Sequence, residues 1–108
     1  MITDLEIEKA VDYLRDNATK AAQARANRIY LEEYRKTIKG ELMRENTQES
    51  LGAQEAIAYA HDRYKQHLLA MRDAIQQDEY HRWMLTAAEA KIEAWRSQQA
   101  NQRALGKL

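Results

Sequence analysis

The chain has 108 residues, 17 basic and 17 acidic side chains, and neither cysteine nor proline. That length suits one domain with a modest core. A formal charge of zero gives no overall attraction to nucleic acid or to acidic membranes, and without cysteine neither a disulfide framework nor a thiolate metal site can form. Good helix formers dominate, and valine occurs once, so the composition predicts an all-α protein.

The first helix is predicted over about residues 4–44. Thr3 and Glu6 have the spacing of a capping box, in which the side chain of each residue bonds to the backbone of the other. Ile2 and Ile7 flank this pair as a hydrophobic staple would. Together these four residues predict where the helix begins.

A turn region is predicted at about residues 45–61, because Asn, Thr, Ser and Gly cluster at its start. It includes a short helix at about residues 53–60. A second long helix is expected over about residues 62–104, ending near Gly106. Forty helical residues measure about 60 Å, and helices of such length need packing partners. We expect residues 1–108 to form a single helical domain.

Both long helices carry apolar residues on a repeat of three and four residues, interrupted by Arg28 on the first helix and by Asp78, Arg82 and Glu89 on the second. They are Leu14, Ala21, Leu31, Ile38 and Leu42 on the first helix, and Tyr64, Leu68, Met71, Ile75, Leu85 and Ile92 on the second. If the chain folds back at about residue 53, the numbers of paired positions sum to about 106. Leu42 then faces Tyr64, Leu31 faces Ile75, and Leu14 faces Ile92, while Arg28 meets Asp78. The pattern predicts a long antiparallel helical hairpin that resembles a coiled coil.

A second apolar face is predicted at the end of the hairpin remote from the turn. It comprises Val11, Ala18, Ala22, Ala26 and Ile29 on the first helix, and Tyr80, Trp83, Met84, Ala87 and Ala94 on the second. Helices that are apolar on two faces pack against more than one neighbour. We therefore expect the hairpin to form a homo-oligomer, most simply a dimer. Its predicted interface contains Val11, Ala18, Ala22, Ala26, Tyr80, Trp83 and Ala87.

Two further expectations accompany this dimer. Trp95 should close the bundle within one chain, whereas Trp83 should lie at the oligomer interface. The alternative architecture is a three-helix monomer, in which the first helix breaks near Asn17 and residues 4–16 fold back. Asn and Asp near this point compete with the helix for backbone hydrogen bonds.

The sequence predicts no catalytic residues, no metal and no cofactor. Asp78 and His81 have the spacing of one carboxylate–histidine motif of a di-iron bundle, but such a site needs two motifs and further glutamates. His61 and His67 are interpreted as surface residues near the turn. There is no glycine-rich phosphate loop and no nucleophile elbow. An enzyme or a metal carrier is therefore the least favoured class.

Basic residues cluster between residues 20 and 39, with six basic side chains against two acidic ones. The candidates for nucleic-acid contact are Lys20, Arg25, Arg35, Lys36 and Lys39. Tyr30, Tyr34 and Trp95 are the candidates to stack on unpaired bases. A solvated helix surface is the simpler interpretation, and a weak single-stranded DNA-binding module remains the alternative function.

Several segments resemble a family of small helical proteins from tailed phages and prophages. They are Arg28–Lys36, Gln54–His61, Arg82-Trp83 and Ala87–Ser97, and the resemblance covers most of the chain. Relatives tend to have proline where this chain has Asp62. Members are often encoded beside single-strand annealing proteins and exonucleases. The resemblance thus implies an accessory role in DNA recombination or replication, and it brings no catalytic residue or cofactor.

Location and function follow as expectations. The first residues lack the basic and apolar run of a signal peptide, and no apolar stretch approaches the roughly 20 residues that cross a bilayer. We expect a protein of the host-cell cytoplasm with no membrane partner. It is expected to act without catalysis, through helical oligomerisation and contacts with a phage recombination or replication protein.

Overall fold

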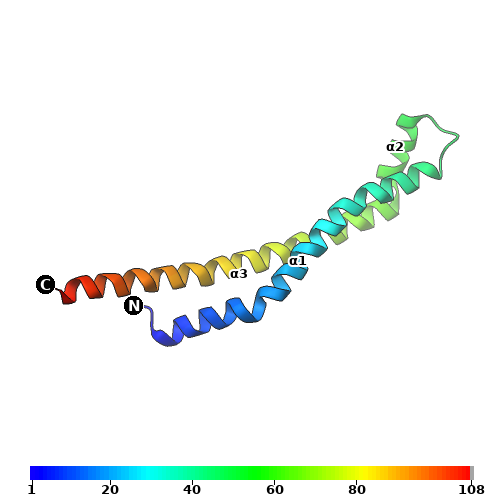
Figure 1. Ribbon diagram of the computed structural model, residues 1–108. Helices are drawn as coiled ribbons and strands as arrows, with labels where there is room; N and C mark the ends of the chain where they lie inside the picture. The colour runs from blue at the N-terminus through cyan, green and yellow to red at the C-terminus, as the bar shows by residue number, and fades with distance from the viewer. Residues whose placement is uncertain (108) are drawn as a thin grey trace. The chain divides into compact units, whose positions relative to one another are not determined.

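The computed structural model describes residues 1–107, and within them the chain forms three α-helices and no strand (Figure 1). Helix α1 spans Asp4–Arg44, α2 spans Leu51–Ala60 and α3 spans Asp62–Gly106. The fold is therefore an all-α helical hairpin, as the composition and the apolar spacing predict. None of these helices combines the length and the apolar character that a membrane span requires over the described residues.

Side-chain caps set the ends of the helices. The Thr3 hydroxyl accepts a hydrogen bond from the Glu6 amide at 3.2 Å, which is one half of the predicted capping box. The Ser50 hydroxyl does the same for the Ala53 amide at 3.2 Å. Because Ser50 is the cap, α2 begins at residue 51, two residues earlier than the sequence indicated.

A single residue, His61, separates α2 from α3. Its ψ of 141° is extended, so the helix cannot continue through it. Its ring Nδ1 accepts a hydrogen bond from the Arg63 amide at 3.0 Å, which satisfies one of the free amides at the start of α3. Asp62 follows as the first helical residue, where a negative charge is favourable.

Helix α1 is continuous through Asn17, so the three-helix alternative with a break at that point is wrong. The Asn17 side chain donates to the Tyr13 carbonyl at 3.0 Å, one turn earlier on the same helix. The amide group therefore bonds to the helix that it was expected to interrupt.

The chain divides into two compact units, each containing part of α1 and part of α3. The central unit comprises residues 23–78 and includes α2, and the terminal unit comprises residues 1–22 and 79–107.

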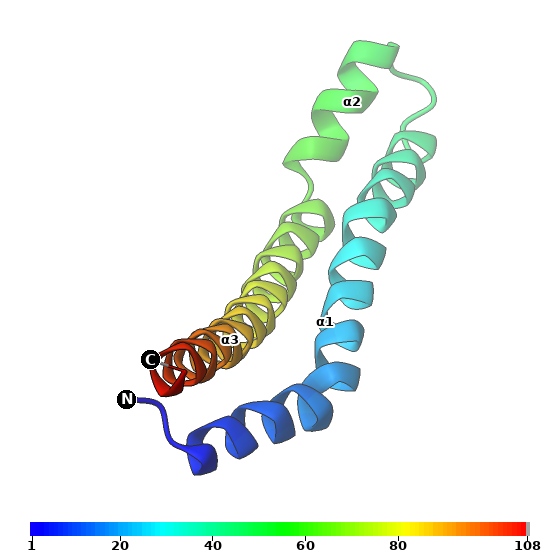
Figure 2. The same ribbon diagram turned by 60° about the vertical axis from the view of Figure 1, so that its left-hand side comes forward.

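In the central unit, α2 lies beside the end of α1 (Figure 2). The buried cluster here is Ile38, Leu42, Ala58 and Tyr64, with Leu42 only 1% exposed. Leu42 and Tyr64 thus share a core, as the predicted register requires. Arg28 Nε lies 2.5 Å from Asp78 Oδ2, which confirms the predicted ion pair. We call the line of facing residues along which α1 and α3 pack the seam.

The α3 side of the seam differs from the prediction in half of its positions. Tyr64, Met71 and Asp78 face inward, as predicted. The inward-facing residues between them are His67 and Ala74. The predicted positions Leu68 and Ile75 are exposed instead, so their predicted pairings with Ile38 and Leu31 are wrong. The predicted and the observed inward positions both repeat every seven residues. After Tyr64 the observed pattern steps first by three residues, to His67, whereas the predicted pattern steps first by four, to Leu68.

In the terminal unit the inward positions of α3 continue the same repeat. They are half-buried and comprise His81, Leu85, Ala88, Ile92 and Trp95. Ala10 of α1 is buried. The Ile2 amide donates to the Gln98 side chain at 3.0 Å, so here the paired numbers sum to 100, below the predicted 106. The difference of six residues is not a whole heptad, so the apolar repeat by itself does not predict it.

Candidate interaction surface

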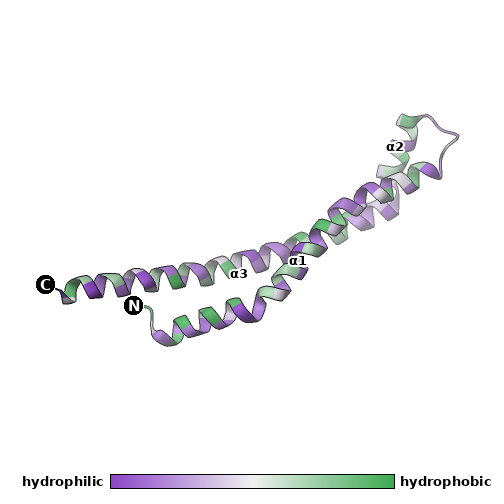
Figure 3. Cartoon of the chain, viewed as in Figure 1, coloured by the Kyte–Doolittle hydropathy of each residue, from purple (hydrophilic) through white to green (hydrophobic). Residues whose placement is uncertain are grey.

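The largest exposed aromatic side chains of α3 lie on a second apolar strip. We call Tyr80, Trp83, Ala87, Ala90 and Ala94 the α3 strip; all five are exposed. Their spacing alternates between three and four, so they share one face of the helix. Trp83 is 63% exposed and Tyr80 is 55% exposed. Figure 3 shows that apolar bands recur along both long helices.

The strip faces away from the intrachain seam. Trp83 lies two residues after His81 and two residues before Leu85, both of which are seam positions. Each residue turns a helix by 100°, so Trp83 points roughly opposite to these two residues. Packing of α3 against α1 therefore leaves the strip free for another partner.

Charged residues border the strip on one side. Arg82 lies 3.5 Å from Glu79, and Arg96 lies 2.9 Å from Glu93, each pair three residues apart on α3. All four side chains are well exposed. An apolar strip with a charged border is the usual composition of a helix–helix interface.

A groove of about 480 Å³ runs along the other border of the strip, within the terminal unit. Met84 and Ala87 of α3 line it together with Lys9, Ala10 and Tyr13 of α1. The side of α1 that carries Lys9 and Tyr13 therefore lies next to the α3 strip.

The α1 half of the predicted interface lies elsewhere. Val11 and Ala18 each follow an inward-facing residue, Ala10 and Asn17, by one position, whereas the groove residue Lys9 precedes Ala10 by one. Residues on either side of a seam position point to opposite flanks of the helix. The structure therefore keeps Val11 and Ala18 exposed but does not bring them onto the face of the α3 strip. Ala22 and Ala26 are exposed as well.

Exposed apolar residues also occur in the central unit. Leu68, Leu69 and Ile75 of α3 are exposed. The expectation that extra apolar surface is confined to the end remote from the turn is therefore wrong. Leu68 and Ile75 are exposed because the seam uses His67 and Ala74 in their place.

The candidate nucleic-acid residues are only partly available. Lys39 Nζ lies 2.5 Å from Glu55 and 4.8 Å from the centre of the Tyr59 ring. The hydrogen bond with Glu55 raises the pKa of Lys39 and lowers that of Glu55. Lys36 pairs with Glu33 at 3.1 Å.

The other three candidates, Lys20, Arg25 and Arg35, are exposed and have no ion pair within residues 1–107. Tyr30 and Tyr34, the proposed stacking residues, stack on each other with ring centres 5.6 Å apart. Lys36 and Lys39 are thus paired with carboxylates, whereas Lys20, Arg25 and Arg35 keep exposed charges on α1.

Two of the three histidines, His67 and His81, lie between α1 and α3, whereas His61 is exposed at the start of α3. His67 is only 8% exposed, so its interpretation as a surface residue is wrong. Its Nε2 lies 2.6 Å from the Leu31 carbonyl, a hydrogen bond that joins α3 to α1. His81 Nδ1 and Trp95 Nε1 are buried and have no hydrogen-bond partner within residues 1–107. No group of three His, Asp or Glu side chains suited to a metal ion occurs in this part of the chain.

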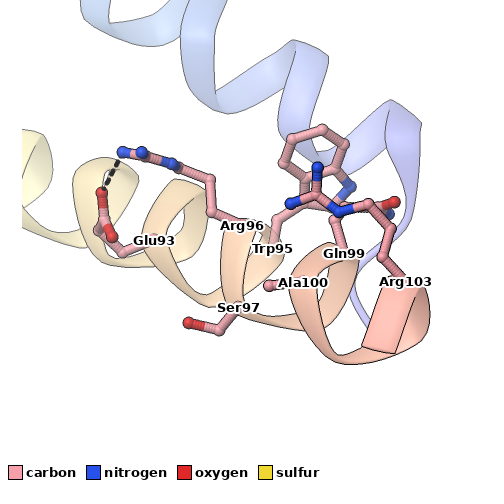
Figure 4. A pocket seen from close by; sticks show the side chains of 7 residues that line it. All are labelled: Glu93, Trp95, Arg96, Ser97, Gln99, Ala100 and Arg103. Atoms are coloured by element: carbon pink, nitrogen blue, oxygen red, sulfur yellow. Dashed lines mark hydrogen bonds and ion pairs between the residues drawn. The ribbon is translucent and has the colours of Figure 1, made fainter. Parts of the chain in front are cut away.

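A second hollow, of about 530 Å³, lies near the end of α3. Its lining comes from α3 alone, and the side chains radiate from the helix (Figure 4). Arg96 turns toward Glu93 while Ser97 points away from both (Figure 4). With no second element converging on it, the hollow lacks the geometry of an enclosed ligand site.

The two tryptophans differ in their surroundings. Trp95 is half-buried on the seam, whereas Trp83 is the more exposed residue on the α3 strip. The α3 strip is therefore an apolar surface of the terminal unit that its intrachain packing leaves uncovered. Comparison of the chain with protein-family models, curated proteins and solved structures finds no match.

Proposed function

We propose that this protein is a non-catalytic helical accessory protein that acts by self-association and by contacts with other proteins. The observation that carries the proposal is the α3 strip, where Trp83 and Tyr80 are exposed on a helix already packed through its opposite face. Burial of such side chains contributes about 25 cal/mol for each Å² of apolar surface removed from water. A second copy of the chain supplies a matching strip.

The biological setting that we propose is DNA recombination or replication in a tailed phage. It rests on the resemblance of Arg28–Lys36 and Ala87–Ser97 to the phage family described above. In that setting the protein is an assembly factor in the host cytoplasm. It would bind an annealing protein or an exonuclease while catalysing no step itself.

Light scattering of the purified protein tests self-association. We expect twice the chain mass of 12.6 kDa for the wild type, and the single-chain mass for Trp83→Gln. Tyr30→Gln is the matched control, because Tyr30 is an aromatic residue of α1 with 61% exposure, outside the α3 strip. A monomeric wild type at micromolar concentration would contradict the proposal.

Purification of tagged protein from infected cells tests the biological setting. We expect an annealing protein or an exonuclease to accompany the wild type in stoichiometric amount. Recovery of the tagged chain alone would contradict an accessory role in recombination.

The alternative function, single-stranded DNA binding, depends on the free charges of Lys20, Arg25 and Arg35. It predicts that a fluorescent oligonucleotide binds at low salt and is released as salt rises. Loss of that binding in Arg25→Gln/Arg35→Gln, with an unchanged dimer, would favour DNA binding over the function proposed here.

A further inference from the structure

His61 is the joint between α2 and α3, and it bonds to both helices. Its amide donates a hydrogen bond to the Ala58 carbonyl of α2 at 3.3 Å, and its carbonyl accepts one from the Lys65 amide of α3 at 3.1 Å. Its ring Nδ1 accepts a third bond, from the Arg63 amide at 3.0 Å. His61 therefore occupies the N-cap position of α3, where a side-chain acceptor bonds to the amide of the second helical residue.

The bond from the Arg63 amide to the His61 ring exists in only one protonation state of that ring. A backbone amide can only donate, so Nδ1 carries a lone pair and the proton of the neutral ring lies on Nε2. When the ring gains a second proton, both nitrogens become donors and Nδ1 no longer accepts. The imidazolium also lies at the positive end of the α3 dipole, which disfavours it there. The Ser50 hydroxyl that caps α2 has no such dependence on pH.

The backbone around His61 does not impose the break between the helices by itself. Residues 58–65 contain neither glycine nor proline, and alanines precede His61 at positions 58 and 60, where they favour a helix. The extended ψ of His61 is therefore maintained by the ring cap and by the burial of Ala58 and Tyr64 in the core on either side of it.

We propose that His61 is a proton-sensitive cap of the joint between α2 and α3. The neutral ring holds the first turn of α3, and protonation releases the Arg63 amide and loosens that turn. The side chain of His61 is exposed, so protons reach it without unfolding of the chain. This device is independent of the self-association and of the DNA contacts discussed above.

The titratable and charged groups near the joint come from all three helices and from the residue after α1. They are Asp62, Arg63 and Lys65 of α3, Glu55 and Tyr59 of α2, and Glu41, Arg44 and Glu45 at the end of α1. Glu41 is paired with the Arg63 side chain at 2.5 Å, and Glu55 is paired with a lysine of α1. The carboxylate of Asp62, the next residue, is an acceptor that a protonated ring can use once it has lost the Arg63 amide.

NMR of the isotope-labelled full chain tests the proposal at two atoms. At about pH 7.5, long-range proton–nitrogen spectra should show the neutral tautomer of His61 with its proton on Nε2. The second observable is the protection of the Arg63 amide against hydrogen exchange, corrected for the intrinsic pH dependence of exchange. It should fall about threefold to tenfold, the effect of a lost helix cap, as the pH is lowered to about 5.5, since an ordinary imidazole gains its proton over this range. Glu55 stays charged throughout, because its pKa is lowered from 4.5.

Two variants separate the ring of His61 from other causes. His61→Asn keeps a side-chain acceptor that does not titrate, so the protection of the Arg63 amide should stay constant within about twofold. His67→Gln removes the other histidine of the central unit and should retain the pH dependence of the wild type. The Ala74 amide, in the interior of α3, is the reference within each protein and should keep its protection.

Every other outcome contradicts the proposal. An Nδ1–H tautomer at neutral pH, or constant protection of the Arg63 amide in the wild type, overturns it directly. An equal fall in His61→Asn means that the ring is not the cause. Loss of the pH dependence in His67→Gln assigns the effect to that histidine. A matching fall at the Ala74 amide means that α3 loosens as a whole.

Discussion

Arg28 and Asp78 occupy facing positions on a seam that is otherwise largely apolar. Arg28 bonds to Asp78 at 2.5 Å and to Glu32 at 3.0 Å, and both are partly buried together with it. The hydrogen bonds to these two carboxylates raise the pKa of Arg28, with that of Asp78 contributing most. The pair fixes which residues face each other, because a charge without its partner would be desolvated at this point.

Removal of one partner should therefore cost more than removal of both. Asp78→Leu should lower the unfolding midpoint, because Arg28 stays on the seam with only Glu32 to accept its hydrogen bonds. Arg28→Leu/Asp78→Leu should recover the midpoint or exceed it, since apolar residues suit the seam. Urea titrations followed by circular dichroism measure both. A double variant less stable than Asp78→Leu would contradict this account.

Lys39 and Glu55 connect α1 to α2, and their pKa shifts give the link a defined pH range. The lowered pKa of Glu55 means that the pair stabilises the fold above the ordinary carboxyl pKa of 4.5 and loses this effect as the pH falls through the lowered value. The raised pKa of Lys39 means that the alkaline loss comes only when the pH rises past that raised value.

Lys39→Met should thus lower the unfolding midpoint at about pH 7, and its difference from the wild type should shrink as the pH falls from the ordinary carboxyl pKa of 4.5 through the lowered pKa of Glu55. Lys36→Met is the control, because the Lys36–Glu33 pair is more exposed and lies within α1 alone. Thermal unfolding at several pH values measures the difference. An equal destabilisation by Lys39→Met at both ends of this range would show that the ion pair is not the cause.

At the scale of the element, Gly40 lies inside α1 without a steric reason for being glycine. A Cβ at this position would meet nothing within 4 Å, and no glycine of residues 1–107 has a positive φ. Gly40→Ala should therefore stabilise the protein by about 0.5–1 kcal/mol through helix propensity and reduced freedom of the unfolded chain.

Chemical denaturation measures the effect of Gly40→Ala. Gly106→Ala is the matched control at the last residue of α3, where the gain should be smaller because helix ends fray. A loss of stability in Gly40→Ala would mean that a partner in solution approaches α1 closely at this residue.

The same scale shows the limit of reading apolar residues alone. Residues 64, 71, 78, 85 and 92 were correctly placed on the α3 seam, because either heptad pattern includes them. The sequence predicts Leu68 and Ile75 at the positions between them, because these are the more apolar residues. The structure uses His67 and Ala74, where a histidine bonds to the Leu31 carbonyl and an alanine leaves space for α1.

At the scale of the whole molecule, the proposed self-association would couple folding to protein concentration. If the folded state is a dimer, a tenfold rise in protein concentration should raise the thermal midpoint by a few degrees. Trp83→Gln should remove this dependence, while Tyr30→Gln should retain it. Calorimetry over a hundredfold range of concentration checks the prediction, and a constant midpoint for the wild type would contradict a dimer.

The sequence by itself determined the all-α class, the ends of α1 and the break after it. These follow from local causes: helix propensity, the Thr3 cap, and a cluster of polar residues and glycine that ends the pattern. The Arg28–Asp78 pair was also predicted, because opposite charges interrupt two apolar stripes at matching places. The exposure of Trp83 follows from its place outside both possible heptads.

Only the tertiary structure showed that His67 and Ala74 lie on the seam in place of Leu68 and Ile75. It alone also showed the pairing of Ile2 with Gln98 and the separation of Val11 and Ala18 from the α3 strip. A seven-residue repeat matches itself at every shift of seven, so the energy that selects one register lies in contacts between helices. Small residues such as Ala74 add little to a sequence pattern, yet they set how closely two helices approach. The packed hairpin therefore decides which apolar residues remain for a partner.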